Sequence, residues 1–282
     1  MSTIATSLTQ EQFKKHIRPY LRTAKRGYES KIPLFKIFNY ILYKLYTGCQ
    51  WSQIPIDKVE AGSEKRELSY HAVYYHFRKW SSDGSLEKVW ESSIIEISAD
   101  LNLSKINFDG SHAIAKKGGN LVEYQGRKKA KTSNILAVTD ANGFIIASTD
   151  IIAGNHNDSY QLKSNLGSVF KSIKRLGIKI KGAFFNADKA FDTKEARKTC
   201  FNYEVIPNIA ENKRNRKKAK RGRKRLFNKE VYKHRFTSER SFAWIDKFRS
   251  LLIRFERSDI YFLGAHFIAF TMINLRHVLA AQ

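Results

Sequence analysis

Cysteine and proline are scarce in this sequence. Its 282 residues include 2 cysteines, Cys49 and Cys200, whose positions match neither a disulfide framework nor the spacing of a zinc site. We therefore expect a reducing, cytoplasmic compartment. With only 4 prolines and 15 glycines, no long flexible linker is evident. The length predicts one large domain or two modest ones.

Long hydrophobic runs are also missing. The segment MSTIATSLTQEQ lacks the basic and apolar regions of a signal peptide. The most apolar late stretch, YFLGAHFIAFTMINL, is short and contains His266 and Asn274. It predicts a buried helix and not a membrane span, so we expect no membrane partner.

Acidic residues are outnumbered by basic ones. Lys and Arg total 51 against 26 Asp and Glu, which gives a net charge of +25. A surplus of this size is typical of proteins that bind the phosphate backbone of nucleic acids. The chain also contains 42% hydrophobic residues, which excludes disorder along its whole length.

The first 100 residues have the pattern of a small helical bundle. Thr9 and Gln12 form a predicted capping box, and apolar residues recur at helical spacing from Phe35 until the TG pair at 47–48. A second helix is predicted within SYHAVYYHFRKW, with Ser69 as its N-cap. Its polar face bears His76, Arg78 and Lys79, which are candidates to contact DNA if the region is a helix-turn-helix module. The alternative is an exposed helix inside a bundle.

The pattern changes to alternating strands and helices near residue 105. The order is β-β-β-α-β-α-β, followed by helices, and it predicts a mixed α+β fold. The first-ranked architecture is an RNase H-like core, in which a mixed β-sheet is flanked by helices. The predicted domains are a helical DNA-binding region at 1–100 and a catalytic domain at 101–282, with a basic insertion at 211–228.

The basic insertion contains ten Lys or Arg and one acid in the fifteen residues ENKRNRKKAKRGRKR. None of this segment can be buried, so it is a loop or a solvated arm for which phosphate contacts are expected. The candidate DNA-binding residues are Lys213, Arg214, Arg216, Lys217, Lys218, Lys220 and Arg221. Beyond it, we expect a long helix over about 229–255, with Trp244 to Phe255 as its apolar face, and a final helix over about 259–280.

Two carboxylates end apolar runs that read as strands. Asp109 follows KINF and Asp188 follows AFFNA, and neighbouring strands would bring both to one edge of the sheet. Two-metal cleavage of phosphodiesters needs carboxylates gathered in this way. Aspartate is also common where a turn begins, so the pattern alone leaves a structural role open. For a third acid, periodicity does not decide between Glu239 and Asp246, and Glu239 could simply pair with Arg235 at i, i+4.

The chain resembles the DDE transposases of bacterial insertion sequences, and the insertion sequence 5 family in particular. The resemblance covers nearly the whole length. It lies in five segments, which are LTQEQF through WSQIP to SYHAVYYHFRKW, FDGSHAIAKKGG, ILAVTDANGFIIASTDIIAGNHNDS, ADKAFD, and YKHRFTSERSFAWIDKFRSLLIRFE.

This resemblance implies that Asp109, Asp188 and Glu239 are the catalytic, metal-binding triad. Tyr232 and Arg235 match the Tyr-Arg-Glu-Lys signature of the last segment and are implied to contact DNA. The lysine of the signature, which is implied to bind DNA, is shifted here: the expected position holds Asp246, and Lys247 lies one residue later.

The implied reaction is cleavage at the terminal inverted repeats of an element and joining of the 3′-hydroxyls to target DNA. The implied cofactors are two Mg²⁺ ions, with Mn²⁺ as substitute, and the implied partners are double-stranded DNA and a second copy of the chain. The alternatives are an RNase H-fold nuclease without strand transfer and an inactive DNA-binding derivative. His112, His156 and Asp158 are left out of the metal site, because an isolated histidine is more often a hydrogen-bonded structural residue.

Overall fold

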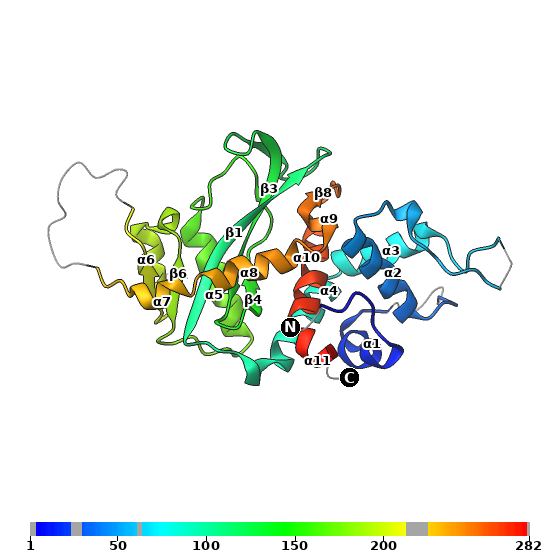
Figure 1. Cartoon of the computed structure of the whole chain (residues 1–282), viewed down its shortest axis with the longest axis horizontal. Coiled ribbons are helices and arrows are strands. Elements are labelled where there is room, and N and C mark those ends of the chain that lie inside the picture. Colours follow the sequence, from blue (N-terminus) through cyan, green and yellow to red (C-terminus); the bar gives the residue numbers. More distant parts are fainter. Residues whose placement is uncertain (1–3, 24–29, 61–63, 213–224, 281–282) are drawn as a thin grey trace. The chain divides into compact units, whose positions relative to one another are not determined.

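The computed structural model describes residues 4–23, 30–60, 64–212 and 225–280, which form two compact units (Figure 1). Unit 1 comprises 1–97, 113–120 and 244–282, and unit 2 comprises 98–112 and 121–243. The N-terminal helices therefore share a unit with the C-terminal end of the chain. The functional division into 1–100 and 101–282 stays a prediction.

Unit 1 is helical. Its elements are α1 (Gln10–His16), η1 (Arg18–Tyr20), α2 (Leu34–Thr47), η2 (Trp51–Gln53), α3 (Tyr70–Ser82), α4 (Ser85–Glu96), α9 (Arg249–Leu252), β8 (Ile253–Arg254), α10 (Asp259–Asn274) and α11 (Arg276–Ala280). The predicted capping box of Thr9 and Gln12 is confirmed at α1. Gly48 ends α2 in the left-handed conformation at φ 73°, as the TG pair predicts.

The core of unit 1 forms around α10, which packs on α3 and α4. The ring of Trp90 stacks on Phe267 with centroids 5.1 Å apart. Most of α10 is buried, including His266, so its apolar sequence serves packing between helices. Within the described part of the chain, no helix is long and apolar enough to cross a membrane.

Unit 2 is built on a mixed sheet. Its strands are β1 (Lys105–Ala115), β2 (Glu123–Gln125), β3 (Ala130–Thr139), β4 (Ile145–Ser148), β5 (Ile152–Ala153), β6 (Phe184–Ala187) and β7 (Ile206–Ile209). The order along the sheet is β2-β3-β1-β6-β7, with β4 and β5 also paired to β3. β6 lies parallel to both β1 and β7. The end of β1 continues into unit 1, where Ile114 pairs with Ile253 of β8.

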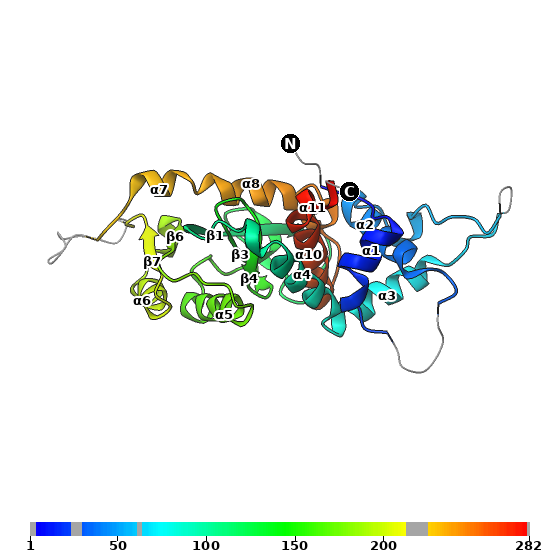
Figure 2. The ribbon, with the colours of Figure 1, turned by 90° about the horizontal axis from the view of Figure 1, so that it is seen from below.

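Helices cover both faces of the unit 2 sheet. Short helices η3 (Ser98–Asp100) and η4 (Lys189–Phe191) accompany α5 (Leu162–Arg175), α6 (Lys194–Asn202), α7 (Lys229–Lys233) and α8 (Phe236–Ile245). Figure 2 shows α5 and α6 on one face and α7 and α8 on the other. The α5 side is apolar, with the rings of Phe108, Phe170 and Phe185 in contact. The predicted mixed α+β fold with an RNase H-like core is confirmed.

The single long helix predicted over 229–255 is wrong. The chain forms α7, α8 and α9 instead, because amide groups near Arg235 bond carbonyls three residues back and interrupt the helical ladder. After α9, Ile253 becomes extended to pair with β1. Two members of the predicted apolar face, Leu252 and Phe255, are exposed as a result.

Candidate active site

Asp109 lies inside β1, and Asp188 directly follows the neighbouring strand β6. The prediction that Asp109 ends its strand is wrong, because β1 continues to Ala115 and pairs there with β8. Asn107 pairs with Asn186 and Phe108 with Ala187 across the parallel strands β1 and β6, and an aspartate is the next residue along the chain in both cases. Parallel strands lie about 4.8 Å apart and side chains alternate between faces, so both carboxylates project on the face covered by α7 and α8. This confirms the expectation that the two strands are neighbours.

Arg235 connects Asp109 to Glu239. One guanidinium nitrogen lies 2.7 Å from Asp109 Oδ2 and the other lies 2.9 Å from Glu239 Oε1. Arg235 sits at the junction of α7 and α8, four residues before Glu239 on the same helical face. The side chain of Glu239 is 61% exposed, whereas those of Arg235 and Asp109 are 22% exposed. The guanidinium therefore lies between two of the three predicted metal ligands.

The environment of Asp109 disfavours its negative charge. Burial raises the pKa of the Asp109 carboxyl above its ordinary value, and the charges of Asp158 and Asp188 raise it further. The amide of Gly110 and the guanidinium of Arg235 act in the opposite direction. The negative charge of Asp109 is therefore stabilised chiefly by the Gly110 amide and the Arg235 guanidinium.

Three buried asparagines form a ladder across the sheet beneath α7. Asn107, Asn186 and Asn208 are paired in register on β1, β6 and β7. Asn186 donates to Asn107 Oδ1 at 2.9 Å, and Asn208 donates to Asn186 Oδ1 at 2.8 Å. The same amides reach the carbonyls of Val231 at 3.2 Å and Asn228 at 3.0 Å. The ladder thus fixes the start of α7, and with it the segment that carries Arg235, over the sheet.

Tyr232 lies in the same segment. Burial raises the pKa of its phenol, and the nearby charge of Arg235 opposes this shift. Its ring is 5.0 Å from that of Phe227. Tyr232 is therefore a half-buried neighbour of the acids.

The donor set of the three acids suits a hard divalent cation, because all of its atoms are carboxylate oxygens. Among the described residues, no three His, Cys, Asp or Glu side chains are already arranged to coordinate one ion. Two of the acids instead share the guanidinium of Arg235. The roles of Asp109, Asp188 and Glu239 as metal ligands stay a prediction.

The sequence analysis missed a second polar group beside Asp109. His112 Nε2 lies 3.4 Å from Asp158 Oδ1, and Asn134 donates to the same oxygen at 2.8 Å. The sequence analysis treats His112 as an isolated histidine, but β1 places it close to Asp158, which lies 46 residues later. The one feature of the sequence that could have indicated this contact is that His112 and Asp158 both lie in segments that resemble the transposase family.

The predicted DNA-binding residues on α3 lie in unit 1 and differ in exposure. Arg78 is exposed, donates to the Tyr261 hydroxyl at 3.0 Å and lies over the Tyr74 ring. Lys79 is half-buried. His76 packs on Trp80, and its Nδ1 is buried without a partner in the described structure. Burial lowers the pKa of His76, so this ring is uncharged at neutral pH.

Of the remaining residues predicted to contact DNA, only Lys247 lies among the described residues. Lys247 is exposed in the turn after α8, in unit 1. Lys213, Arg214, Arg216, Lys217, Lys218, Lys220 and Arg221 lie outside the described residues. At the described end of the basic insertion, Arg225 pairs with Asp192, which also pairs with Arg197.

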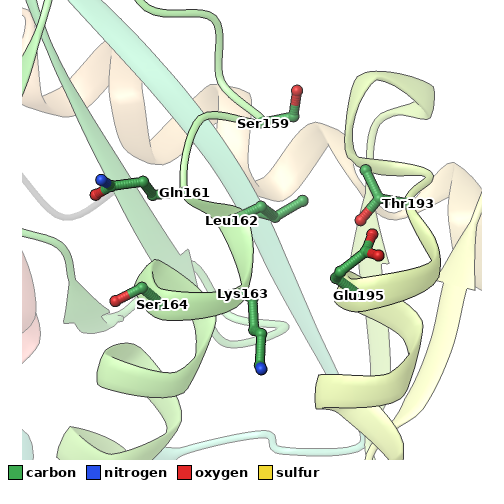
Figure 3. A pocket seen from close by; sticks show the side chains of 7 residues that line it. All are labelled: Ser159, Gln161, Leu162, Lys163, Ser164, Thr193 and Glu195. Atoms are coloured by element: carbon green, nitrogen blue, oxygen red, sulfur yellow. The ribbon is translucent and has the colours of Figure 1, made fainter.

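Figure 3 shows an open hollow in unit 2 at the N-terminal ends of α5 and α6. Its lining includes Gln161, Lys163, Thr193 and Glu195. None of the three predicted ligands lines it, so we do not assign the chemistry to this hollow.

Two family models match the chain. Residues 104–275 match a model described as a transposase DDE domain, and residues 8–90 match a putative transposase of the IS4/5 family. The chain belongs to the DDE transposases of the IS4/5 type. It is therefore a DNA transposase that depends on divalent metal, as the resemblance implied.

Solved structures similar to this transposase include the Mos1 transposase paired-end complex with the left transposon end, at 9% identity and a TM-score of 0.32 over 92% of this chain and 81% of that chain. The Mos1 mariner paired-end complex with Mn is 13% identical, with a TM-score of 0.29 over 92% and 82%. No curated protein sequence matches the chain significantly.

Proposed function

We propose that this transposase cleaves DNA at the terminal inverted repeats of its own element and joins the 3′-hydroxyls to target DNA, with Asp109, Asp188 and Glu239 as metal ligands. The observation that carries the proposal is the in-register placement of the two aspartates, with Arg235 linking Asp109 to Glu239. Segments that are distant in sequence thus lie on one face of the sheet, which supports the proposal.

The proposed cofactor is a pair of Mg²⁺ ions, for which Mn²⁺ can substitute. Such a pair activates the attacking oxygen and stabilises the leaving oxygen of an in-line displacement. The all-oxygen donor set favours a hard divalent cation. No covalent link between protein and DNA is required, so Tyr232 serves to position DNA or to pack.

Arg235 has a second role in this proposal. Its guanidinium pairs with Asp109 and Glu239. A metal ion held by those carboxylates would compete with the guanidinium, whose planar donors match a phosphate. The Arg235 side chain would then be available to hold the DNA backbone near the acids.

DNA binding is also assigned to basic residues that lie apart from Asp109, Asp188 and Glu239. Arg78 and Lys79 on α3, Lys247 and the basic insertion at 211–228 would contact phosphates, with His76 as a neutral neighbour. Joining two ends to one target requires at least a dimer of the chain. We place this reaction in the bacterial cytoplasm, at the nucleoid.

A strand-transfer assay tests the proposal. The full chain is mixed with end-labelled duplexes copied from the DNA flanking its gene, a supercoiled plasmid and MgCl₂, and the products are separated on a gel. We expect cleaved ends and plasmid-joined products from the wild type. Asp188→Ala should form neither product while still retarding the duplex in a mobility-shift gel.

Two results would overturn the proposal. Cleavage without joined product would identify a nuclease that lacks strand transfer. Binding without cleavage, in Mn²⁺ as well as Mg²⁺, would identify an inactive DNA-binding derivative. Asp150→Ala, which removes an exposed acid that lies outside the proposed triad, is the matched control and should retain both products.

A further inference from the structure

Asp158 is held beside strand β1 by two side chains from the sheet. Its Oδ1 accepts a hydrogen bond from Asn134 at 2.8 Å and lies 3.4 Å from His112 Nε2. The other ring nitrogen of His112 lies 3.2 Å from the Thr132 hydroxyl. With its proton on Nε2, the ring can donate to Asp158 and accept from Thr132. Only 7% of the His112 side chain is exposed, so this geometry is enforced by packing.

Asp158 approaches the backbone of β1 at Gly110, the residue after Asp109. A Cβ atom at Gly110 would lie 2.7 Å from Leu136 Cδ2, 3.1 Å from Asp158 Oδ1 and 3.3 Å from Asn134 Oδ1. Asn134 is 1% exposed, and its Oδ1 has no hydrogen-bond partner within the described structure. A buried acceptor without a partner is costly, and here it points at the backbone beside Asp109.

One carboxylate oxygen of Asp158 is not used by the contacts that hold it. Both contacts with His112 and Asn134 end at Oδ1, which leaves Oδ2 without a side-chain hydrogen bond from any described residue.

We propose that Asp158 is a fourth acidic residue of the metal site, with His112 and Asn134 as its positioning residues. The inference rests on the proposed function, because it takes Asp109 as a ligand of the ion that Asp158 helps to hold. Asp158 lies just before α5, on a chain segment different from those of the other three acids.

Binding of Mn²⁺ to the full chain without DNA tests the assignment, with free Mn²⁺ followed by electron paramagnetic resonance. Asp158→Asn preserves shape and removes the charge, and we expect about tenfold weaker binding or more. His112→Phe leaves every carboxylate in place and removes only the support, and we expect binding to weaken severalfold. Asp150→Asn makes the same chemical change at an exposed acid and should bind as the wild type does.

The two proposals can fail separately. If Asp188→Asn weakens Mn²⁺ binding but Asp158→Asn does not, the assignment of Asp158 is overturned and the triad stands. If neither change has an effect, the metal site itself is overturned. His112→Phe should add no further loss in an Asp158→Asn background, and an additive loss would show that His112 does not act through Asp158. Melting temperatures verify that each variant is folded before it is compared.

Discussion

The guanidinium of Arg235 lies 2.7 Å from the carboxylate of Asp109, a residue 126 positions earlier in the chain. Burial acts to lower the pKa of Arg235, but the nearby Asp109, Tyr232 and Glu239 together keep this pKa above its ordinary value. The helix that carries Glu239 is therefore tied to β1 through the guanidinium of Arg235.

Arg235→Gln should make the protein more dependent on metal. Without metal, the loss of a charged hydrogen bond to a mostly buried carboxylate should lower the free energy of unfolding by roughly 1.5–3 kcal/mol. Because the competing guanidinium is gone, Mn²⁺ should raise the melting temperature of the variant more than that of the wild type. Thermal unfolding with and without Mn²⁺ measures both effects. Lys233→Gln, at an exposed pair on α7, is the control, and equal Mn²⁺ shifts in all three proteins would refute the competition.

Asn186→Ala should damage both stability and activity. The change leaves Asn107 Oδ1, the Asn208 amide and the Val231 carbonyl without their present partner, which corresponds to roughly 1–3 kcal/mol of unfolding free energy. Since α7 loses one of its hydrogen bonds to the sheet, strand transfer should fall more than DNA binding. Urea unfolding and the gel assay check this, with the exposed Asn202→Ala as control. Unchanged stability would show that the ladder does not hold α7.

Alanine substitutions at Gly154 and Gly167 should change the stability of the protein in opposite directions. A Cβ at Gly154 would lie 2.0 Å from the Thr132 carbonyl oxygen, so Gly154→Ala forces the backbone apart and should cost roughly 1–3 kcal/mol. A Cβ at Gly167, inside α5, meets nothing within 4 Å, and Gly167→Ala should stabilise by roughly 0.5–1 kcal/mol. Denaturant titration of the two variants tests the pair. A stable Gly154→Ala protein would contradict the packing described.

His266 should make stability depend on pH in weakly acid solution. Burial lowers the pKa of His266 to about 4, against 6.5 as the ordinary value. Below about pH 6.5 the unfolded chain takes up a proton that the folded chain does not, so stability falls as the pH is lowered from 6.5 to 4. At about 1.4 kcal/mol per pH unit, the loss is about 3 kcal/mol. The difference between wild type and His266→Gln, measured by urea unfolding at several pH values, should shrink across this interval, and a constant difference would refute the assignment.

The strands that carry Asp109 and Asp188 could be predicted from the sequence, because an apolar run followed by an acid is a local pattern. Glu239 could not be chosen in this way, since its position on α8 resembles that of an ordinary exposed partner of Arg235. Its selection needed the resemblance to a family. The contact between Asp109 and Arg235 could not be predicted from local sequence patterns, because it joins residues from different secondary-structure elements.

The interruptions between α7, α8 and α9 show a second limit of sequence patterns. The apolar spacing from Trp244 onward suits a helix, but the chain turns at 246–248, and Ile253 then becomes extended to pair with β1. The asparagine ladder was missed for a related reason. Each asparagine lies in a different strand, and only the register aligns them.

The register between β1 and β6 also determines which mutations are compatible with this site. Asp109 and Asp188 owe their common orientation to the number of residues that precede them in two paired strands. Deleting one residue from 105–108 would turn Asp109 toward the apolar side, whatever the identity of its neighbours. Length variation among descendants of this gene should therefore collect in connecting segments and spare both strands, while single replacements remain tolerable at many strand positions.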